Sequence, residues 1–123
     1  MACNNSSTDK TDQAAKQEDK QFFVYNWSYY IAEDTIANFE KETGIKVVYD
    51  VYDSNETLEA KLLSGSSGYD VVFPSARPFA EKQIMAGIFA DLDKASLTNW
   101  SNNDPSILKS LSLIDPGNAK LAP

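Results

Sequence analysis

The chain has 123 residues, a length that corresponds to about one domain. Its 18 Asp and Glu residues outnumber its 11 Lys and Arg residues, and the formal net charge is −7. This balance argues against binding to a nucleic-acid backbone, since such binders carry basic patches, and weakly favours cationic partners. Histidine is absent and cysteine occurs once. An internal disulfide is therefore excluded, and we predict no metal or cofactor site.

The first 20 residues differ in composition from the rest of the chain. Residues 4–20 contain no aromatic and no large aliphatic side chain, so they cannot bury enough apolar surface to offset the entropy lost on ordering. We therefore expect residues 1–20 to form a flexible tether. The start, Met1-Ala2-Cys3-Asn4, resembles the mature start of a bacterial lipoprotein, in which a cysteine after a small residue receives the lipid. Cys3 is thus a lipidation candidate, with an incidental tail cysteine as the alternative.

Strand and helix patterns alternate from residue 21 onward. The apolar run at 22–25 predicts a first strand, and residues 32–43 predict a helix with apolar side chains on one face. Residues 45–52 are rich in β-branched and aromatic side chains, which is typical of a strand. A second helix is expected to begin after Asp53 or Ser54, because the spacing of polar residues there is that of a capping box.

The second half of the chain continues this alternation. The segment GSSG at 65–68 ends the second helix, and the almost entirely apolar run at 69–73 predicts a central strand covered on both faces. A loop is expected at 75–78, followed by a third helix at 79–86. Residues 105–113 predict a short amphipathic helix. The whole pattern predicts an α/β fold with a parallel sheet and right-handed crossovers.

Two loops of this predicted fold carry candidate binding residues. Ligands of open α/β sheets bind at the carboxyl ends of the strands, so the loops after the first and third strands are expected to meet there. The first loop region reads YNWSYY over residues 25–30, and its Trp and Tyr rings suit an organic cation or a flat apolar ligand. The alternative is that Trp27 and Tyr30 are ordinary core or surface aromatics.

A long stretch of the sequence resembles a known family. The residues YNWSYYIAEDTIANFEKETGIKVVYDVYDSNETLEAKLLSGSSGYDVVFPS, followed by AGIFADLDK, are similar to the N-terminal part of the periplasmic polyamine-binding proteins of ABC importers. These putrescine and spermidine receptors have a type II periplasmic-binding-protein fold, in which two α/β lobes joined by a hinge enclose the ligand. The resemblance implies that Trp27, Ser28, Tyr30 and Ser75 are cleft residues of the first lobe. There, an aromatic wall would contact the methylene and ammonium groups of a polyamine, and hydroxyls would accept hydrogen bonds from the ammonium groups.

The chain departs from the family pattern at two candidate site residues. Tyr29 stands where the familiar motif has an aspartate, and Arg77 stands where a neutral polar or aromatic residue is usual. At an effective dielectric near 20, two like charges about 6 Å apart repel by roughly 3 kcal/mol. We therefore keep open a ligand that carries a carboxylate, which Arg77 would bind, or a less charged amine. Alternatively, Arg77 faces solvent or an acid of the second lobe.

The resemblance also implies a partial receptor. Residues 21–123 would form a parallel-sheet first lobe that stops before the hinge and the second lobe, with exposed sheet edges and apolar faces. The expected partners are a small polyamine-like amine, the membrane subunits of an ABC importer, and either the missing C-terminal portion or a second copy of the chain. The expected location is the periplasm or the cell surface, with a lipid anchor at Cys3. A natural short protein and a proteolytic fragment both remain open.

Two other classes of function compete with a receptor lobe. Asp50, Asp53 and Glu56 could serve an enzyme as carboxylates, but their places at a strand end and a helix cap favour a structural role. The sequence has no evident nucleophile–base pair and no Gly-rich phosphate loop, so we predict that the protein is not an enzyme. The other alternative is a complementing or domain-swapped interaction fragment with no ligand affinity of its own.

Overall fold

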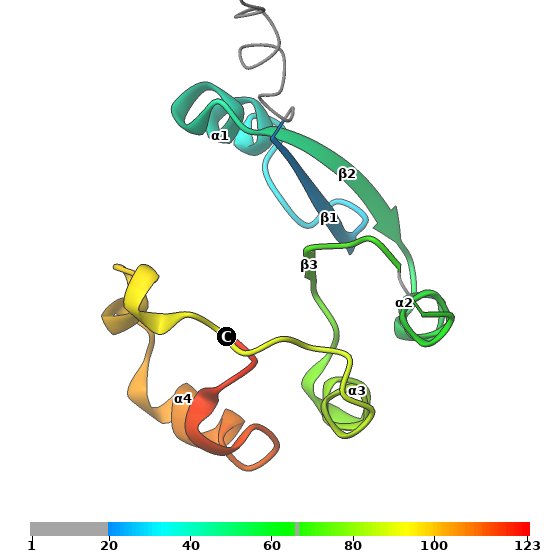
Figure 1. Cartoon of the computed structure of the whole chain (residues 1–123), viewed down its shortest axis with the longest axis vertical. Helices are drawn as coiled ribbons and strands as arrows, with labels where there is room; N and C mark the ends of the chain where they lie inside the picture. Colours follow the sequence, from blue (N-terminus) through cyan, green and yellow to red (C-terminus); the bar gives the residue numbers. More distant parts are fainter. Residues whose placement is uncertain (1–19, 66) are drawn as a thin grey trace, which may run out of the picture.

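A computed structural model describes residues 20–65 and 67–123. The strands β1 (Gln21–Trp27), β2 (Lys46–Tyr52) and β3 (Val71–Val72) form a parallel sheet in the order β2-β1-β3 (Figure 1). The register pairs Trp27 with Tyr52, so β1 and β2 end side by side. The α/β fold with a parallel sheet is thus confirmed. The predicted tether, apart from Lys20, and the lipidation candidate Cys3 lie outside the described residues.

Two helices cover opposite faces of the sheet. They are α1 (Thr35–Thr43), between β1 and β2, and α2 (Asn55–Leu63), between β2 and β3. Phe39 of α1 stacks on Phe22 of β1, with ring centroids 5.9 Å apart, whereas Leu58 of α2 packs with Tyr25 of β1. Since strand side chains alternate between the two faces, Phe22 and Tyr25 point in opposite directions. The shorter helices α3 (Glu81–Met85) and α4 (Pro105–Leu111) follow β3 (Figure 1).

The buried core on the α2 face is largely aromatic. Tyr25, Tyr52, Leu58 and Leu62 form its centre, with Trp27 and other half-buried side chains packed against it. The Tyr25 ring lies 4.7 Å from that of Tyr52 in an edge-on arrangement, measured between centroids. Aromatic pairs of this geometry contribute roughly 0.5–1.5 kcal/mol beyond burial of their surface. The core therefore stabilises the sheet directly beside the end of β1.

On the α1 face, the sheet is only partly covered. A groove of about 160 Å³ lies between α1 and the strands, with a lining that is almost entirely apolar and includes Val24, Ile36 and Val47. Asn26 also lines this groove and is only 1% exposed, yet its amide nitrogen Nδ2 has no partner among the described residues. Its Oδ1 accepts a hydrogen bond from the backbone N–H of Trp27 at 2.7 Å.

Local hydrogen bonds account for the helix ends. Ser54 is the N-cap of α2, where its hydroxyl accepts a bond from the Thr57 N–H at 3.2 Å, which satisfies one of the free donors of the first turn. Gly44 ends α1 in the left-handed conformation at φ 71°, as expected for a C-terminal glycine. Asp104 caps α4 by accepting bonds from Ser106, and these bonds lower the pKa of its carboxyl group.

The strands differ from the prediction at their ends and in their order. β1 extends to Trp27, so Asn26 and Trp27 are strand rather than loop. The central strand among the described residues is β1, and the apolar 69–73 segment contributes only the two-residue edge strand β3. Asp70 explains the late start of β3, because its side chain accepts the Phe23 N–H at 2.8 Å. Pro74 follows Phe73 and has no N–H to extend the pairing.

The boundaries of three helices also differ from the prediction. α3 covers Glu81–Met85 rather than 79–86. α1 begins at Thr35 rather than 32, and α4 ends at Leu111 rather than 113. The predicted loop at 75–78 is the first part of an irregular helical turn, η1 (Ala76–Ala80), which leads into α3. Within it, Arg77 is extended at φ −122° and ψ 138°, as expected for a residue before proline.

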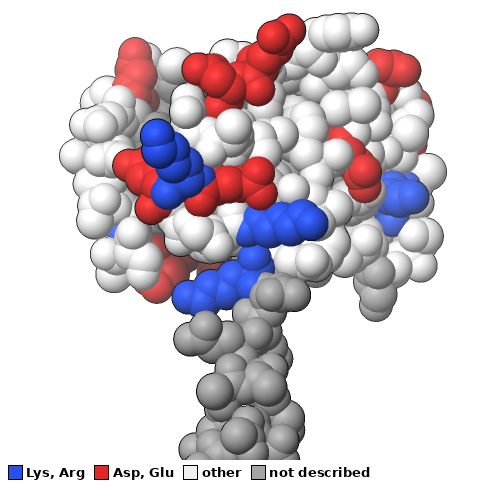
Figure 2. Space-filling view, turned by 90° about the horizontal axis from the view of Figure 1, so that it is seen from above, with Lys and Arg blue, Asp and Glu red and all other residues white. Residues whose placement is uncertain are grey.

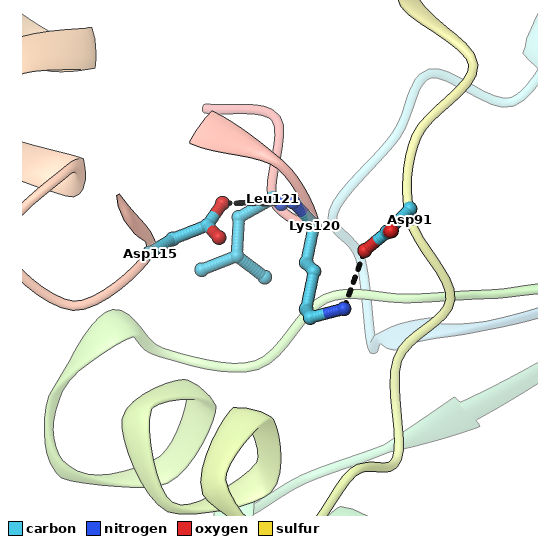
Figure 3. A network of polar contacts seen from close by, with 4 residues as sticks. All are labelled: Asp91, Asp115, Lys120 and Leu121. Atoms are coloured by element: carbon cyan, nitrogen blue, oxygen red, sulfur yellow. Dashed lines mark hydrogen bonds and ion pairs between the residues drawn. The ribbon is translucent and has the colours of Figure 1, made fainter. Parts of the chain in front are cut away.

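A buried carboxylate fixes the last residues of the chain. Asp115 is 1% exposed, and its Oδ2 accepts the backbone N–H groups of Lys120 at 3.0 Å and Leu121 at 2.8 Å (Figure 3). The Lys120 ammonium forms an ion pair with Asp91. These bonds hold residues 119–121 against the segment after α3. None of the helices in residues 20–65 and 67–123 is both long and apolar enough to cross a membrane.

Candidate functional site

The candidate site lies at the edge where β1 and β2 end. Trp27, the last residue of β1, donates a hydrogen bond from its indole Nε1 to the backbone carbonyl of Phe73, at 2.7 Å. The Tyr52 hydroxyl, at the end of β2, donates to the same carbonyl at 2.7 Å. The two donors therefore fasten the segment after β3 to the ends of the other strands. This brings together the two predicted loops, as the sequence indicated.

Tyr52 supports the Trp27 ring from inside the protein. The two ring centroids lie 4.8 Å apart, and Tyr52 is only 3% exposed. Burial raises the pKa of Tyr52 from 10.0 to about 12, because the charged phenolate is poorly solvated there. The hydroxyl thus stays protonated at neutral pH and remains a donor. Trp27 itself is half-buried, so part of its surface is open to a ligand.

Ser28 follows β1 and is held by the end of β2. Its backbone N–H donates to the Tyr52 carbonyl at 3.1 Å, and its hydroxyl donates to Oδ1 of Asp53 at 2.8 Å. Asp53 is the residue directly after β2 and is exposed. A serine hydroxyl that donates to a carboxylate keeps its own oxygen lone pairs available as acceptors. The pair therefore forms a polar, acceptor-rich corner beside Trp27.

Ser75 is held by the first residue of α2. The backbone N–H of Ser75 donates to Oδ1 of Asn55 at 2.9 Å, and its hydroxyl accepts a bond from Nδ2 of the same residue at 3.0 Å. This two-point contact fixes the loop after β3 relative to α2. Ser75 is exposed, so its hydroxyl is accessible at the same edge as Ser28.

The two tyrosines after Ser28 are both exposed but differ in their surroundings. Tyr29 has a left-handed backbone at φ 57°, and its side chain is fully exposed. Tyr30 is 64% exposed, and its ring lies edge-on to that of Phe73, with centroids 6.3 Å apart. Tyr30 thus lies close to the Trp27–Phe73 contact, whereas Tyr29 projects into solvent.

Arg77 lies apart from this cluster. Its Nε forms an ion pair with Glu81 one helical turn later, at 3.6 Å, and its side chain is 60% exposed. It also lines a groove of about 340 Å³ between η1 and α4, with Ile107, Leu111 and Ile114 among the other lining residues. The structure therefore pairs Arg77 with an acid of its own chain. The predicted partners were solvent, a ligand or an acid of a second lobe.

Four residues of the site were not among its predicted members. Tyr52 and Phe73 hold the Trp27 indole, Asp53 binds Ser28, and Asn55 binds Ser75. The sequence does contain a signal for Asp53, since a residue directly after one parallel strand faces the residue directly after its neighbour. That signal requires the strand register, which pairs Trp27 with Tyr52.

The surface charge agrees with the composition. On the face shown in Figure 2, acidic and basic side chains are interspersed among many uncharged atoms. A nucleic-acid binder is expected to carry a continuous basic surface. The described part of this face carries none.

The parallel α/β fold gathers the candidate residues at the carboxyl ends of its strands, which is the edge where open α/β proteins bind ligands. Residues 11–119 match the family described as bacterial extracellular solute-binding protein. The chain belongs to this family. The match confirms the predicted membership of a solute-binding family rather than an enzyme family.

Two similar relatives are named as putrescine-binding periplasmic proteins. The chain is 60% identical over 101 residues to the putrescine-binding periplasmic protein PotF of Escherichia coli, covering 82% of this chain and 27% of the relative. It is 57% identical over 110 residues to the putrescine-binding periplasmic protein SpuD of Pseudomonas aeruginosa, covering 89% and 30%. These matches confirm the resemblance to polyamine-binding proteins, but the chain spans less than a third of the length of either relative.

Solved structures of similar fold also come from this class of protein. The spermidine/putrescine ABC transporter substrate-binding protein PotD of Streptococcus pneumoniae superposes with a TM-score of 0.75 at 32% identity, covering 81% of this chain and 30% of that one. The Tp0655 lipoprotein of Treponema pallidum also gives a TM-score of 0.75, at 33% identity, covering 81% and 31%. The fold is therefore that of part of a periplasmic binding protein.

Proposed function

We propose that the chain forms part of an extracytoplasmic receptor that captures a polyamine or a related small amine for ABC-type import. The observation that carries this proposal is the cluster at the ends of β1 and β2. It combines the half-buried indole of Trp27 with the hydroxyls of Ser28 and Ser75. The names of the relatives, which include putrescine-, spermidine-, agmatine- and cadaverine-binding proteins, support the same class of ligand.

The chemistry of the cluster suits an aliphatic diamine. The faces of Trp27 and Tyr30 would pack along the methylene chain and attract an ammonium group through the ring quadrupole. Ser28 and Ser75 would accept hydrogen bonds from the ammonium group. Tyr29 would contribute only if the ligand reaches the outer side of the loop, because its side chain is fully exposed.

A ligand with a carboxylate is the second candidate, and the exposed guanidinium of Arg77 is the observation that favours it. Arginine binds carboxylates bidentately, and 60% of this side chain is exposed. Glu81 competes for the same guanidinium at 3.6 Å and offsets the repulsion that Arg77 would exert on an amine. We therefore rank the polyamine first.

The further partners belong to the whole receptor. Membrane subunits of an ABC importer would receive the ligand, and a second polypeptide segment, or a second copy of the chain, would close over the site. The proposed location is the periplasm or the cell surface. Cys3 would carry a lipid anchor, and one relative of similar fold, from Treponema pallidum, is named as a lipoprotein. A purely complementing fragment would bind the second segment whether or not ligand is present.

Isothermal titration calorimetry on the full-length gene product tests the proposal. Putrescine, spermidine, agmatine and cadaverine are titrated separately, with glutamate as a carboxylate-bearing control. We expect saturable binding of at least one of the four amines, and loss of it in Trp27→Ala with the far-ultraviolet circular dichroism unchanged. Binding of glutamate alone, or of none of these compounds, would contradict the proposed function.

A further inference from the structure

One acidic side chain at the edge where β1 and β2 end, that of Asp53, contacts a candidate site residue and has no role in the function proposed so far. We propose that Asp53 is a positioning and specificity-determining residue for cationic ligands: it orients the Ser28 hydroxyl and supplies negative charge at this end of the site. The inference rests on the proposed function, because it concerns the same site.

The parallel register creates the contact between Asp53 and Ser28. Trp27 and Tyr52 are paired across β1 and β2, so the residues that follow them lie next to each other. The backbone N–H of Ser28 bonds to the Tyr52 carbonyl at 3.1 Å, which extends the pairing by one step. The Ser28 hydroxyl then reaches Oδ1 of Asp53 at 2.8 Å. The contact thus depends on the sheet itself rather than on a flexible loop.

This contact determines what Ser28 offers a ligand. A hydroxyl has one donor and two acceptor lone pairs, and here the proton is directed toward a carboxylate, which cannot itself donate. The Ser28 oxygen is left as an acceptor, which suits an ammonium group and disfavours a carboxylate. A carboxylate accepts about four hydrogen bonds, so Asp53 can also accept one from the ligand.

Asp53 is also the source of charge in the cluster. The hydrogen bonds at this edge form three separate contacts: Trp27 and Tyr52 with the Phe73 carbonyl, Ser28 with Asp53, and Asn55 with Ser75. Asp53 is the one acidic residue among the side chains in these contacts. The positive charge of Arg77, in η1, is offset by Glu81. The exposed carboxylate of Asp53 therefore favours a cation, with a strength that depends on salt.

The test compares variants of the full-length gene product in putrescine titrations. Asp53→Asn keeps an oxygen that can accept the Ser28 hydroxyl but removes the charge. Glu56→Gln is the matched control, since Glu56 is an exposed acid in the first turn of α2. We expect Asp53→Asn to weaken binding about tenfold or more and to flatten its salt dependence, with Glu56→Gln within about twofold of the wild type.

A double-mutant cycle tests the positioning role. If Asp53 acts through Ser28, the combined Asp53→Ala and Ser28→Ala variant loses less affinity than the sum of the single losses. Additive losses would overturn positioning, and equal affinities of Asp53→Asn and the wild type would overturn the charge role. The charge role would also be overturned if the wild-type protein bound putrescine with the same affinity at low and high salt, a measurement that needs no variant. Wild-type protein that binds no amine would overturn the proposed function and this inference together.

Discussion

The indole of Trp27 donates a hydrogen bond to the backbone carbonyl of Phe73, a residue 46 positions later in the chain, at 2.7 Å. This bond joins the end of β1 to the segment after β3. The same carbonyl also accepts the Tyr52 hydroxyl. One acceptor thus connects all three strands at the edge where the ligand is proposed to bind, and the orientation of the Trp27 ring depends on the tertiary fold.

Replacement of Trp27 by Phe distinguishes the contribution of the aromatic ring from that of the indole N–H donor. The variant keeps an aromatic face but loses the bond to Phe73, whose carbonyl retains the Tyr52 donor. We expect a loss of about 1 kcal/mol in the free energy of unfolding, the usual net value of one hydrogen bond. Trp27→Ala should cost about 2 kcal/mol or more, because it also removes packing against Tyr52. Urea unfolding measures both. An unchanged free energy of unfolding in Trp27→Phe would contradict the role of the bond, and equal losses in the two variants would contradict the role of the packing.

Tyr52 should make the free energy of unfolding fall at alkaline pH. Its pKa is raised to about 12 in the folded protein by burial, whereas the unfolded value is about 10. The folded state therefore holds the proton more tightly. The contribution of Tyr52 to the free energy of unfolding is fully present below pH 10 and is lost as the pH rises from about 10 to 12, by about 3 kcal/mol at most. Tyr69 shows a raised pKa of about 12 as well, caused first by burial and then by its bond to Asp50.

Tyr52→Phe and the double variant with Tyr69→Phe check this expectation. Urea unfolding is measured at pH 8 and at steps up to pH 11. The fall in stability should be smaller in Tyr52→Phe and smallest in the double variant. An unchanged fall in both variants would assign it to other groups, such as lysines that lose their charge in the same range.

The sequence was sufficient for the fold class and for part of the site. Its strand–helix alternation and the capping-box spacing at Asp53 and Ser54 are local features, and the structure confirms them, with Ser54 as the cap. The short β3 was missed because its start depends on a side-chain bond from Asp70 to β1, a contact between residues 47 positions apart. Asp53 was missed as a site residue for a similar reason, since its contact with Ser28 requires the strand register.

Asp115 should be the most sensitive position in the last part of the chain. Its carboxylate is 1% exposed and accepts two backbone N–H groups, from Lys120 and Leu121. Asp115→Ala leaves both donors without this partner, at about 1–3 kcal/mol for each buried group. We expect the free energy of unfolding to fall by about 2–4 kcal/mol, as measured by urea unfolding.

Asp91→Asn provides the matched control for this prediction. Asp91 is paired with Lys120 in the same network, but its side chain is 75% exposed. Exposed ion pairs contribute little, so a change within about 0.5 kcal/mol is expected. If Asp91→Asn destabilised the protein as much as Asp115→Ala, the ion pair rather than the buried carboxylate would be the main restraint on residues 119–121.

Arg77→Ser distinguishes the two classes of ligand. If the guanidinium binds a ligand carboxylate, the variant should lose affinity for a carboxylate-bearing amine by about tenfold or more. If Arg77 only repels an amine, putrescine should instead bind more tightly to the variant. The gain in binding free energy should be smaller than the roughly 3 kcal/mol expected for an unpaired charge, because Glu81 offsets part of the charge of Arg77. The free energy of unfolding should change by no more than about 0.5 kcal/mol, because exposed ion pairs contribute little. Glu81→Gln is the complementary variant, since it frees the guanidinium and should shift both affinities in the opposite sense. Unchanged affinity for both ligand classes in Arg77→Ser would remove Arg77 from the site.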